Sequence, residues 1–393
     1  MRLLISLLAG CVAVAANAAS FEDILEQTWL RYPPSQAVAA RQDEAAAQGA
    51  IASGWLAAPP VLGAQVTSDR LTENRGFQEL EAELALPLWW PGERTARAAL
   101  AHRESESVTA ASQALRLELA GKLREAAWAV KLAEAEHRLA QQRESDAARL
   151  KQDVSRRVKA GALGSADALL ARDEAVTARQ ATLEKAIELQ EARRAYRQLT
   201  GTDELPSPLE EAAAVAPDEH PERQAARAAA AAAEGKVRLA GKALNERPAL
   251  LLGAKYDRAE YGQDGENTLR IGIAIPLGGD RFRRPEVAAA QAELSEAAAT
   301  QALADDRLPL AVATAQTQLT HETERLAAAR ERQAIAREHL ELLQKSFDLG
   351  FLDLPTLLRT RSSAAAAELD FTRQQLRVAR ARARLNQAQG VLP

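Results

Sequence analysis

The sequence is one pattern written twice, because a constant offset of 189 positions (276 minus 87) relates its two halves. The matched pairs include Pro87 and Pro276, Arg94 and Arg283, Gly161 and Gly350, Leu163 and Leu352, and Gly201 and Gly390. Each copy has the pattern of a short helix, two strands, a very long helix, a glycine-marked turn and a returning helix. An internal repeat of this length decides the fold, because both copies must adopt the same local structure. We therefore expect a mainly α-helical protein with a small β part, built from two tandem repeats.

The repeat also sets the expected domain boundaries. Residues 19–201 form the first repeat and residues 220–393 the second. Residues 202–219, which are rich in proline and glutamate, are expected to form a connecting belt between them.

The N-terminal segment, residues 1–18, has the features of a secretory signal peptide. A basic residue at the start precedes an apolar core, and small residues then mark a cleavage site near Ala18. A second interpretation is open, because the four residues ending in Cys11 resemble a lipoprotein box. Cleavage near Ala18 leaves a mature chain without cysteine, since the whole sequence contains only one.

Composition argues against several classes of protein. Aromatic residues make up only 4% of the chain, which suits long coiled helices better than an enzyme core. The formal net charge of −4 gives no indication of nucleic acid as a partner. The five histidines are scattered, without the spacing of metal ligands: His102, His137, His220, His321 and His339. No nucleophile elbow, phosphate-binding loop or paired-carboxylate motif is present. We expect no enzyme, no cofactor and no resident metal.

Two long segments with few prolines and glycines predict the longest helices, at residues 91–160 and 280–349. Each would be about 105 Å long at 1.5 Å per residue. Gly121 and Pro309 lie near the middle of the two segments, and we expect a bend there. After turns at Gly161 and Gly350, shorter helices are expected to return over residues 165–200 and 354–389. Helices of this length and composition imply close-packed coiled hairpins.

Four short segments predict β-strands, and two of them alternate sharply between polar and apolar residues. In the segment 77–87, Glu79, Glu81 and Glu83 face one way, while Leu80, Ala82, Leu84 and Leu86 face the other. The matching segment of the second copy places Leu269, Ile271, Ile273 and Ile275 on one face and Thr268, Arg270, Gly272 and Ala274 on the other. Residues 61–69 and 249–258 are the remaining two strands. We expect one wet face and one apolar face.

The ordered set of junctions, turns and helix ends resembles the TolC family of outer-membrane channel proteins. The residues that carry the resemblance are the strand-to-helix junctions 86–94 and 275–281, the turns at Gly161 and Gly350, and the helix ends at Gly201 and Gly390. No single motif is specific, but the set occurs twice at fixed spacing. The junction Trp90-Pro91-Gly92-Glu93-Arg94 and the segment 352–359 are most similar to members paired with heavy-metal pumps.

The resemblance implies a passive exit duct in the outer membrane. Three identical chains would combine their four strands each into a 12-stranded barrel, because four strands cannot close and open edges are not tolerated in lipid. The helices would form a tunnel in the periplasm. The implied partners are a periplasmic adaptor (a membrane fusion protein), an inner-membrane pump of the RND type, and outer-membrane lipid. Heavy-metal cations are the expected cargo, with drug efflux and type I protein secretion as alternatives.

The same resemblance assigns roles to individual residues. The adaptor is expected to dock at the two turns, on Gly161, Leu163, Ser165, Asp167, Gly350, Leu352, Asp353 and Pro355. The barrel lumen is expected to be lined by Glu79, Glu81, Glu83 and Arg270, and the lipid face by Leu80, Leu84, Leu86, Leu269, Ile271 and Ile273. Trp89 and Trp90 are expected at the membrane surface or at the contact between chains.

The expected gate departs from the family pattern. In the best-known relatives, acidic residues just past the second turn form the constriction at the inner end of the tunnel. Thr356 and Arg359 occupy those positions here. Arg359 and Arg361 could form a basic ring, or could pair with acids on neighbouring helices.

Two other classes of protein remain as alternatives. A periplasmic adaptor also contains a helical hairpin, but it carries one hairpin with flanking β-domains, whereas this chain has two. A structural coiled-coil protein without a pore would leave the alternating strands unexplained.

Overall fold

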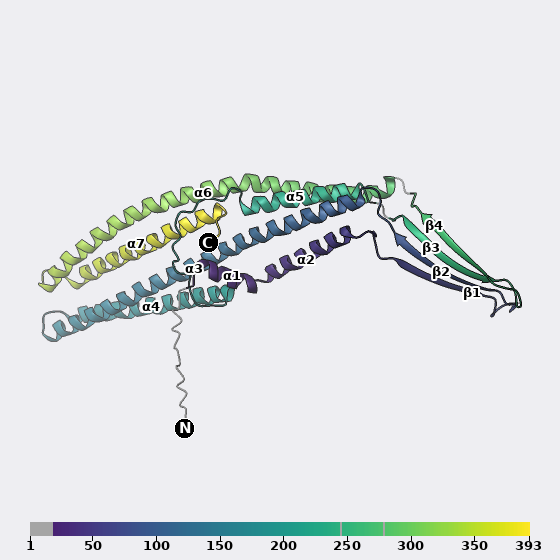
Figure 1. The fold of residues 1–393 in the computed structure, drawn as a ribbon. Helices are drawn as coiled ribbons and strands as arrows, with labels where there is room; N and C mark the ends of the chain where they lie inside the picture. Colours follow the sequence, from purple (N-terminus) through teal and green to yellow (C-terminus); the bar gives the residue numbers. More distant parts are fainter. Residues whose placement is uncertain (1–18, 244–245, 278–279) are drawn as a thin grey trace, which may run out of the picture. The chain divides into compact units, whose positions relative to one another are not determined.

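The computed structural model describes residues 19–243, 246–277 and 280–393 (Figure 1). The expected signal peptide and the lipoprotein box at Cys11 lie outside the described residues. The chain divides into two compact units. We call them the tip unit (the described residues up to Arg31, Leu119–Val215 and Thr314–Pro393) and the sheet unit (Tyr32–Glu118 and the described part of Ala216–Ala313).

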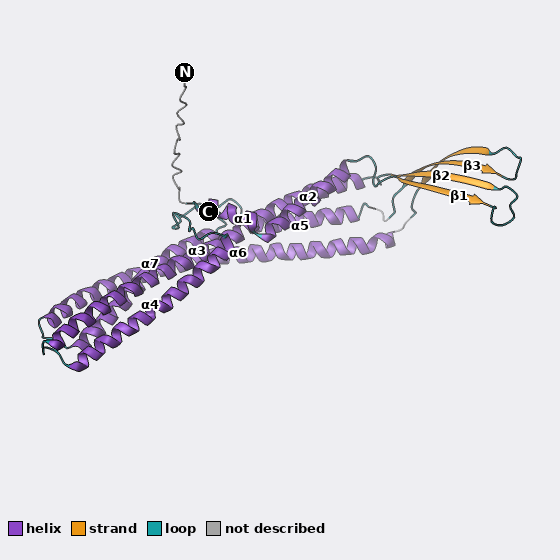
Figure 2. Cartoon of the chain, turned by 90° about the horizontal axis from the view of Figure 1, so that it is seen from below, coloured by secondary structure: helices purple, strands orange, loops and turns teal. Residues whose placement is uncertain are grey.

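The elements follow the expected repeat. The helices are α1 (Phe21–Arg31), α2 (Pro33–Ser53), α3 (Glu93–Lys159), α4 (Ser165–Thr200), α5 (Pro221–Ala240), α6 (Asp280–Asp348) and α7 (Leu354–Ala388). The strands are β1 (Val61–Ser68), β2 (Gln78–Pro87), β3 (Ala249–Arg258) and β4 (Glu266–Ala274). Each copy therefore contributes helices and two strands in the same order, and the four strands form one small sheet, which confirms the expected fold class (Figure 2). No helix in the described part of the chain combines the length and the apolar character that crossing a membrane requires.

Local signals explain where the first helices begin. Ser20 caps α1: its hydroxyl accepts a hydrogen bond from the Asp23 N–H at 3.1 Å, and the Asp23 carboxylate accepts one from the Ser20 N–H at 2.9 Å. Pro33 and Pro34 occupy the first turn of α2, where the missing N–H groups have no helical partner in any case. The two prolines therefore mark the boundary between α1 and α2.

The two long helices are continuous, at 67 residues for α3 and 69 residues for α6. Helix α6 runs through Pro285 and Pro309. Gly121 has a packing role that we did not expect, because a Cβ atom there would lie 2.9 Å from Nε2 of Gln387 in α7. The absence of a side chain lets these two helices approach closely.

The repeat is visible in the way each long helix holds the short helix before it. In the sheet unit, Arg94 at the start of α3 donates hydrogen bonds to the last carbonyls of α2, at Ala52 (3.1 Å) and Ser53 (2.8 Å). Its counterpart Arg283 donates to Gly241 O at the end of α5 (3.3 Å). Each arginine supplies donors to carbonyls that a helix end leaves without partners. The paired arginines therefore perform the same task in both copies.

The tip unit contains two hairpins: α6 lies beside α7, and α3 lies beside α4 (Figure 1). Ion pairs join α3 to both α7 and α4. Glu136 of α3, with only 8% of its side chain exposed, accepts from Arg373 of α7 at 2.5 Å and from Lys185 of α4 at 2.8 Å. Glu125 of α3 pairs with Arg380 and Arg384 of α7.

The first half of the connecting belt is held against this unit by one buried arginine. Arg124, with 3% of its side chain exposed, makes a bidentate pair with Glu211 at 2.7 and 2.8 Å. It also donates to Gln387 Oε1 at 2.5 Å and to Val391 O at 3.2 Å. Arg124, which belongs to α3, thus joins the belt to the end of α7. It can do so because its planar guanidinium carries five N–H donors.

The Glu136 pairs predict a pH-dependent loss of stability. Burial raises the pKa of Glu136, but hydrogen bonds from Arg373 and Lys185 outweigh it and leave the pKa below its usual value. A lowered folded-state pKa means that the stabilisation is complete above the unfolded pKa of about 4.3 and is lost as the pH falls through the folded pKa. We expect Glu136→Gln to lower the free energy of unfolding by about 3 kcal/mol at pH 7. This difference should shrink below about pH 4, as measured by urea unfolding in detergent.

The control for this prediction is Glu341→Gln. Glu341 pairs with Arg337 on the surface, where 63% and 75% of the two side chains are exposed. Its loss should cost less than about 1 kcal/mol. A Glu136→Gln effect that stays constant from pH 7 to pH 3 would contradict the assignment.

Candidate functional site: the hairpin tips and the faces of the sheet

The two turns that end the long helices have the same backbone structure. Gly161 and Gly350 have φ values of 76° and 82°, in the left-handed region that favours glycine. In each turn, the glycine N–H bonds the carbonyl three residues earlier, and the next N–H bonds the carbonyl five residues earlier. These bonds close a Schellman motif, which satisfies carbonyls at the end of the helix. A Cβ atom on either glycine would meet nothing within 4 Å, so the requirement for glycine comes from the backbone alone.

The two tips share one apolar core, so both lie at the same end of the tip unit. We call this cluster the tip core; its buried members are Leu150, Val154, Ala171, Phe347, Leu354 and Leu357. They come from both hairpins, with α3 and α4 on one side and α6 and α7 on the other. The two hairpins are therefore joined by close packing at their tips.

The residues expected to dock an adaptor divide into two groups. Gly161, Ser165, Gly350, Asp353 and Pro355 are exposed. The other three stabilise the tip itself. Leu163 and Leu352 are half-buried and pack against the tip core, and the Asp167 carboxylate accepts a hydrogen bond from the Gly164 N–H at 3.0 Å. Pro355 lies in the first turn of α7, as expected.

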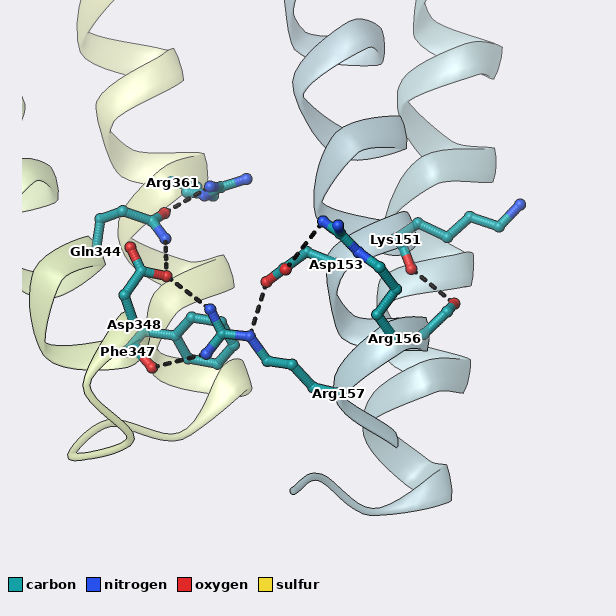
Figure 3. A network of polar contacts seen from close by, with 9 residues as sticks. Lys151, Asp153, Arg156, Arg157, Gln344, Phe347, Asp348 and Arg361 are labelled. Atoms are coloured by element: carbon teal, nitrogen blue, oxygen red, sulfur yellow. Dashed lines mark hydrogen bonds and ion pairs between the residues drawn. The ribbon is translucent and has the colours of Figure 1, made fainter. Parts of the chain in front are cut away.

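Arg157 joins the ends of α3 and α6 next to the tip core (Figure 3). It pairs with Asp153 of its own helix at 2.8 Å and with Asp348 of α6 at 2.9 Å. It also donates to Phe347 O at 3.2 Å, and its guanidinium lies 4.9 Å from the centre of the Phe347 ring. The contacts of Arg157 with α6 were not expected. Only its pair with Asp153, four residues earlier on the same helix, follows from spacing in the sequence.

The two arginines expected near the gate differ in their surroundings. Arg359 is exposed and makes no hydrogen bond or ion pair within the described ranges. Arg361 is half-buried and donates to Gln344 Oε1 at 2.5 Å. Burial lowers the pKa of Arg361, and the nearby carboxylates of Asp146, Asp348 and Glu174 oppose that effect. The expectation that arginines here face acids on neighbouring helices therefore suits Arg361, while Arg359 remains open to solvent. Thr356 is half-buried.

A groove of about 1230 Å³ runs along α3, α6 and α7 and adjoins the tip core at Leu150. Its walls alternate in charge, with Asp146, Arg149 and Asp153 from α3 and Glu341 and Lys345 from α6. In the described residues, no group of three or more His, Cys, Asp or Glu side chains could hold a metal ion. The groove therefore presents mixed charge along a helix surface.

In the sheet unit, the strand register separates two chemically distinct faces. The sheet is antiparallel with the order β1-β2-β3-β4, and residues at paired positions share a face. The charged face carries Gln65, Thr67, Glu79, Glu81, Glu83, Lys255, Asp257, Glu266, Thr268 and Arg270. The apolar face carries Leu62, Val66, Leu80, Leu84, Leu86, Leu250, Leu252, Leu269, Ile271 and Ile273. The register groups the residues of each face as expected from the alternation. Ile275 is the exception, because it lies one residue beyond the end of β4.

The apolar face of the sheet is exposed in the single chain. On the apolar face, Leu269, Ile271 and Ile273 are 86%, 78% and 66% exposed. On the charged face, Glu79 pairs with Lys255 at 3.2 Å and Glu81 with Arg270 at 3.9 Å. Large apolar side chains exposed along neighbouring strands mark a surface that packs against protein or lipid, whereas the charged face is suited to water.

Trp89, at the junction between β2 and α3, makes its contacts within the chain. Its indole N–H donates to Gly54 O at 3.0 Å, and Arg97 lies 5.9 Å from the centre of its ring. Trp89 therefore helps to join the sheet to α2 and α3 within the sheet unit.

No protein-family model and no curated protein sequence matches the chain. Among solved structures, CusC, described in connection with transmembrane channel formation, gives a TM-score of 0.77 at 15% identity, over 97% of this chain and 96% of that chain. The outer membrane protein VceC of Vibrio cholerae gives 0.71 at 16% identity, over 94% and 96%. The open state of the MtrE outer membrane channel of Neisseria gonorrhoeae gives 0.72 at 17%, over 94% and 89%.

The chain shares their fold. The likeness covers nearly the whole of each molecule, so both repeats and the sheet belong to it.

Proposed function

We propose that this chain forms the outer-membrane exit duct of a tripartite efflux system, as a homotrimer. It would passively receive substrate from an inner-membrane pump of the RND type through a periplasmic adaptor. The fold that it shares with outer-membrane channels supports this function. The single observation that carries the proposal is the sheet with one charged face and one exposed apolar face.

This sheet has the chemistry of one third of a transmembrane barrel. Its apolar face would contact lipid through Leu80, Leu84, Leu86, Leu269, Ile271 and Ile273, and its charged face would line a water-filled lumen through Glu79, Glu81, Glu83 and Arg270. The strands at its two edges, β1 and β4, each have one side without a partner in the four-stranded sheet. Because open edges are not tolerated in lipid, three copies would join edge to edge and close twelve strands.

Heavy-metal cations are the cargo that we propose. The charged face carries five acids (Glu79, Glu81, Glu83, Asp257 and Glu266) and two bases (Lys255 and Arg270). Each chain would thus present three more negative than positive charges (five minus two) to the lumen, which favours cations. The similarity of the Trp90–Arg94 junction to members paired with heavy-metal pumps supports the same cargo. Drug efflux and type I secretion remain the alternatives for the same duct.

The adaptor would dock on the exposed part of the tips. Gly161, Ser165, Gly350, Asp353 and Pro355 offer backbone and small side chains at the end of the tip unit. Leu163, Leu352 and Asp167 would act indirectly, because they stabilise the shape of the turns. Thr356 and Arg359 would form the gate, with Arg359 supplying a ring of three positive charges.

The gate assignment predicts a change in ion selectivity. In Arg359→Asp, a ring of three negative charges would replace three positive charges, and Arg359 has no partner among the described residues to lose. Single-channel recordings in planar bilayers should show a shift of selectivity towards cations. The control is Arg156→Asp, since Arg156 is 79% exposed on α3. Equal selectivity in Arg359→Asp and wild type would remove Arg359 from the constriction.

The function itself is tested by deleting the gene and measuring what the cells retain. We expect cells preloaded with zinc, cobalt or cadmium to keep more metal than the parent strain, and cells preloaded with a lipophilic dye to be unchanged. The protein should be found as a trimer in the outer-membrane fraction. Dye retention without metal retention would favour drug efflux. Absence of the protein from that fraction, or crosslinked species no larger than a dimer, would rule out the duct.

A further inference from the structure

The two outer helices of the tip unit expose large apolar side chains in rows. On α4 the row contains Leu169, Val176, Leu183 and Ile187, which are between 51% and 66% exposed. On α6 it contains Ile335, Leu342 and Leu349, which are between 57% and 71% exposed. We call these rows the α4 stripe and the α6 stripe. Side chains this large and this exposed lie on a helix face that lacks its packing partner.

Their spacing is that of a coiled-coil seam. Leu169, Val176 and Leu183 are seven residues apart, as are Ile335, Leu342 and Leu349. A seven-residue repeat keeps side chains on one face of a helix that packs along another helix. Between each two apolar residues of a stripe lies one polar residue on the same face, four residues from one and three from the other. These polar residues are Asp173 and Gln180 on α4, and Lys345 and Glu338 on α6.

The two stripes lie on helices that belong to different hairpins. Helix α7 contacts α6, where Gln333 bonds Glu368, and it contacts α3, where Arg373 bonds Glu136. Helix α4 is held to α3 by Lys185. The α4 stripe and the α6 stripe are both exposed in the tip unit, so each unit has one unfilled seam on α4 and a different one on α6.

We propose that the α4 stripe of one copy packs against the α6 stripe of the next copy, in an antiparallel seam held in register by an Asp173–Lys345 ion pair. This inference rests on the trimer proposed above and assigns its interface in the tip unit. The seam is antiparallel because α4 begins just after one tip and α6 ends just before the other, and both tips lie at the same end.

The register follows from the matching steps. Counting away from the tip, α4 places Leu169, Asp173, Val176, Gln180 and Leu183 at steps of four, three, four and three. Counted away from its own tip, α6 has Leu349, Lys345, Leu342, Glu338 and Ile335 at the same steps. Apolar residues then meet apolar residues at three levels. At the level between the first two, an acid meets a base.

The charges at that level are available for such a pair. Asp173 and Lys345 are both exposed, and neither makes a hydrogen bond or an ion pair within the described residues. Opposite charges beside an apolar seam select partner and orientation, because a shifted register would place like charges or unpaired charges together. At the next level Gln180 faces Glu338, which is compatible with an amide-to-carboxylate hydrogen bond.

The proposed contact joins two different surfaces, the α4 stripe and the α6 stripe. Each copy therefore uses its α4 stripe against one neighbour and its α6 stripe against the other. Such head-to-tail contacts close into a ring when the rotation between copies permits. The sheet has the same property, because its two edge strands, β1 and β4, also differ. The helical seam and the edges of the sheet would therefore be satisfied by the same ring of copies.

The test is an exchange of charge followed by a disulfide trap. Asp173→Lys and Lys345→Asp should each reduce the proportion of trimer in detergent, by roughly five-fold for an exposed pair. The combined variant should restore the trimer to near the wild-type proportion. Asp173→Cys combined with Lys345→Cys should give covalent dimers and trimers on mild oxidation, and neither single variant should do so.

The outcomes separate this inference from the proposed function. If wild-type trimers form, but the double-cysteine variant never crosslinks and the charge variants assemble normally, the seam lies elsewhere and the duct survives. If the single charge variants weaken the trimer and their combination weakens it further, the ion pair is wrong. If the wild-type protein forms no trimer at all, the proposed function itself fails.

Discussion

Replacing Ile273 by arginine is expected to remove most of the heat-stable trimer from the outer-membrane fraction. Ile273 is 66% exposed on the apolar face of the sheet and is paired with Leu250 on the neighbouring strand. If that face contacts lipid, a charge near the middle of the bilayer costs about 2–4 kcal/mol per chain. A trimer carries the substitution three times, so the effect on assembly multiplies. Leu84→Arg should act in the same way. The measurement is the amount of trimer that resists heating in detergent.

The matched control is Thr268→Arg, on the charged face of the same strand. Thr268 is paired with Lys255 and shares its face with Arg270. A further arginine there would remain in water, so trimer should form at nearly the wild-type level. The assignment of the faces would be inverted if Thr268→Arg prevented assembly and Ile273→Arg did not.

Gly350→Val is expected to abolish export while trimers remain. Gly350 has a φ of 82°, and a left-handed backbone costs an ordinary L-residue about 1–2 kcal/mol, with a larger penalty for a β-branched one. The turn would relax towards another conformation and displace Phe351 and Leu352, which follow it directly. The ion pairs of Glu125 and Glu136 with α7 lie away from the turn, so most of the packing between helices, and with it assembly, should be retained. Export of preloaded metal and trimer yield are measured in the same cells.

Asparagine provides the control at this position, because it tolerates the left-handed region better than other non-glycine residues. Since nothing lies within 4 Å of a Cβ atom at Gly350, Gly350→Asn should keep the turn and most of the export. Normal export by Gly350→Val with an intact trimer would show that the shape of this tip does not matter for docking. Equal loss in both variants would point to the side chain rather than to the backbone.

Much of the fold could be predicted because its signals are local and occur twice. The bounds of α4 (Ser165–Thr200) and β3 (Ala249–Arg258) agree with the expected ranges, since glycines, prolines and period-two alternation mark them. The grouping of Glu79 with Arg270 on one face of the sheet followed from the same alternation and from the repeat.

The parts that sequence reasoning missed depend on contacts between distant residues. Arg157 meets Asp348, and Arg124 meets Glu211 and Gln387, only after the hairpins have packed. Neither spacing nor composition distinguishes these arginines from the many others on long helices. The capping role of Arg94 and Arg283 had a signal, because the two are matched by the repeat, but a matched position does not reveal which carbonyl it binds.

The shared geometry of the two tip turns has a consequence for stoichiometry. In the trimer that we propose, three chains would present six turns with the same Schellman backbone, an approximate sixfold arrangement. The side chains alternate around it, because Ala162 follows Gly161 while Phe351, which is 83% exposed, follows Gly350. A partner that recognises only the backbone would find six equivalent places to bind. One that recognises the phenyl ring would find three.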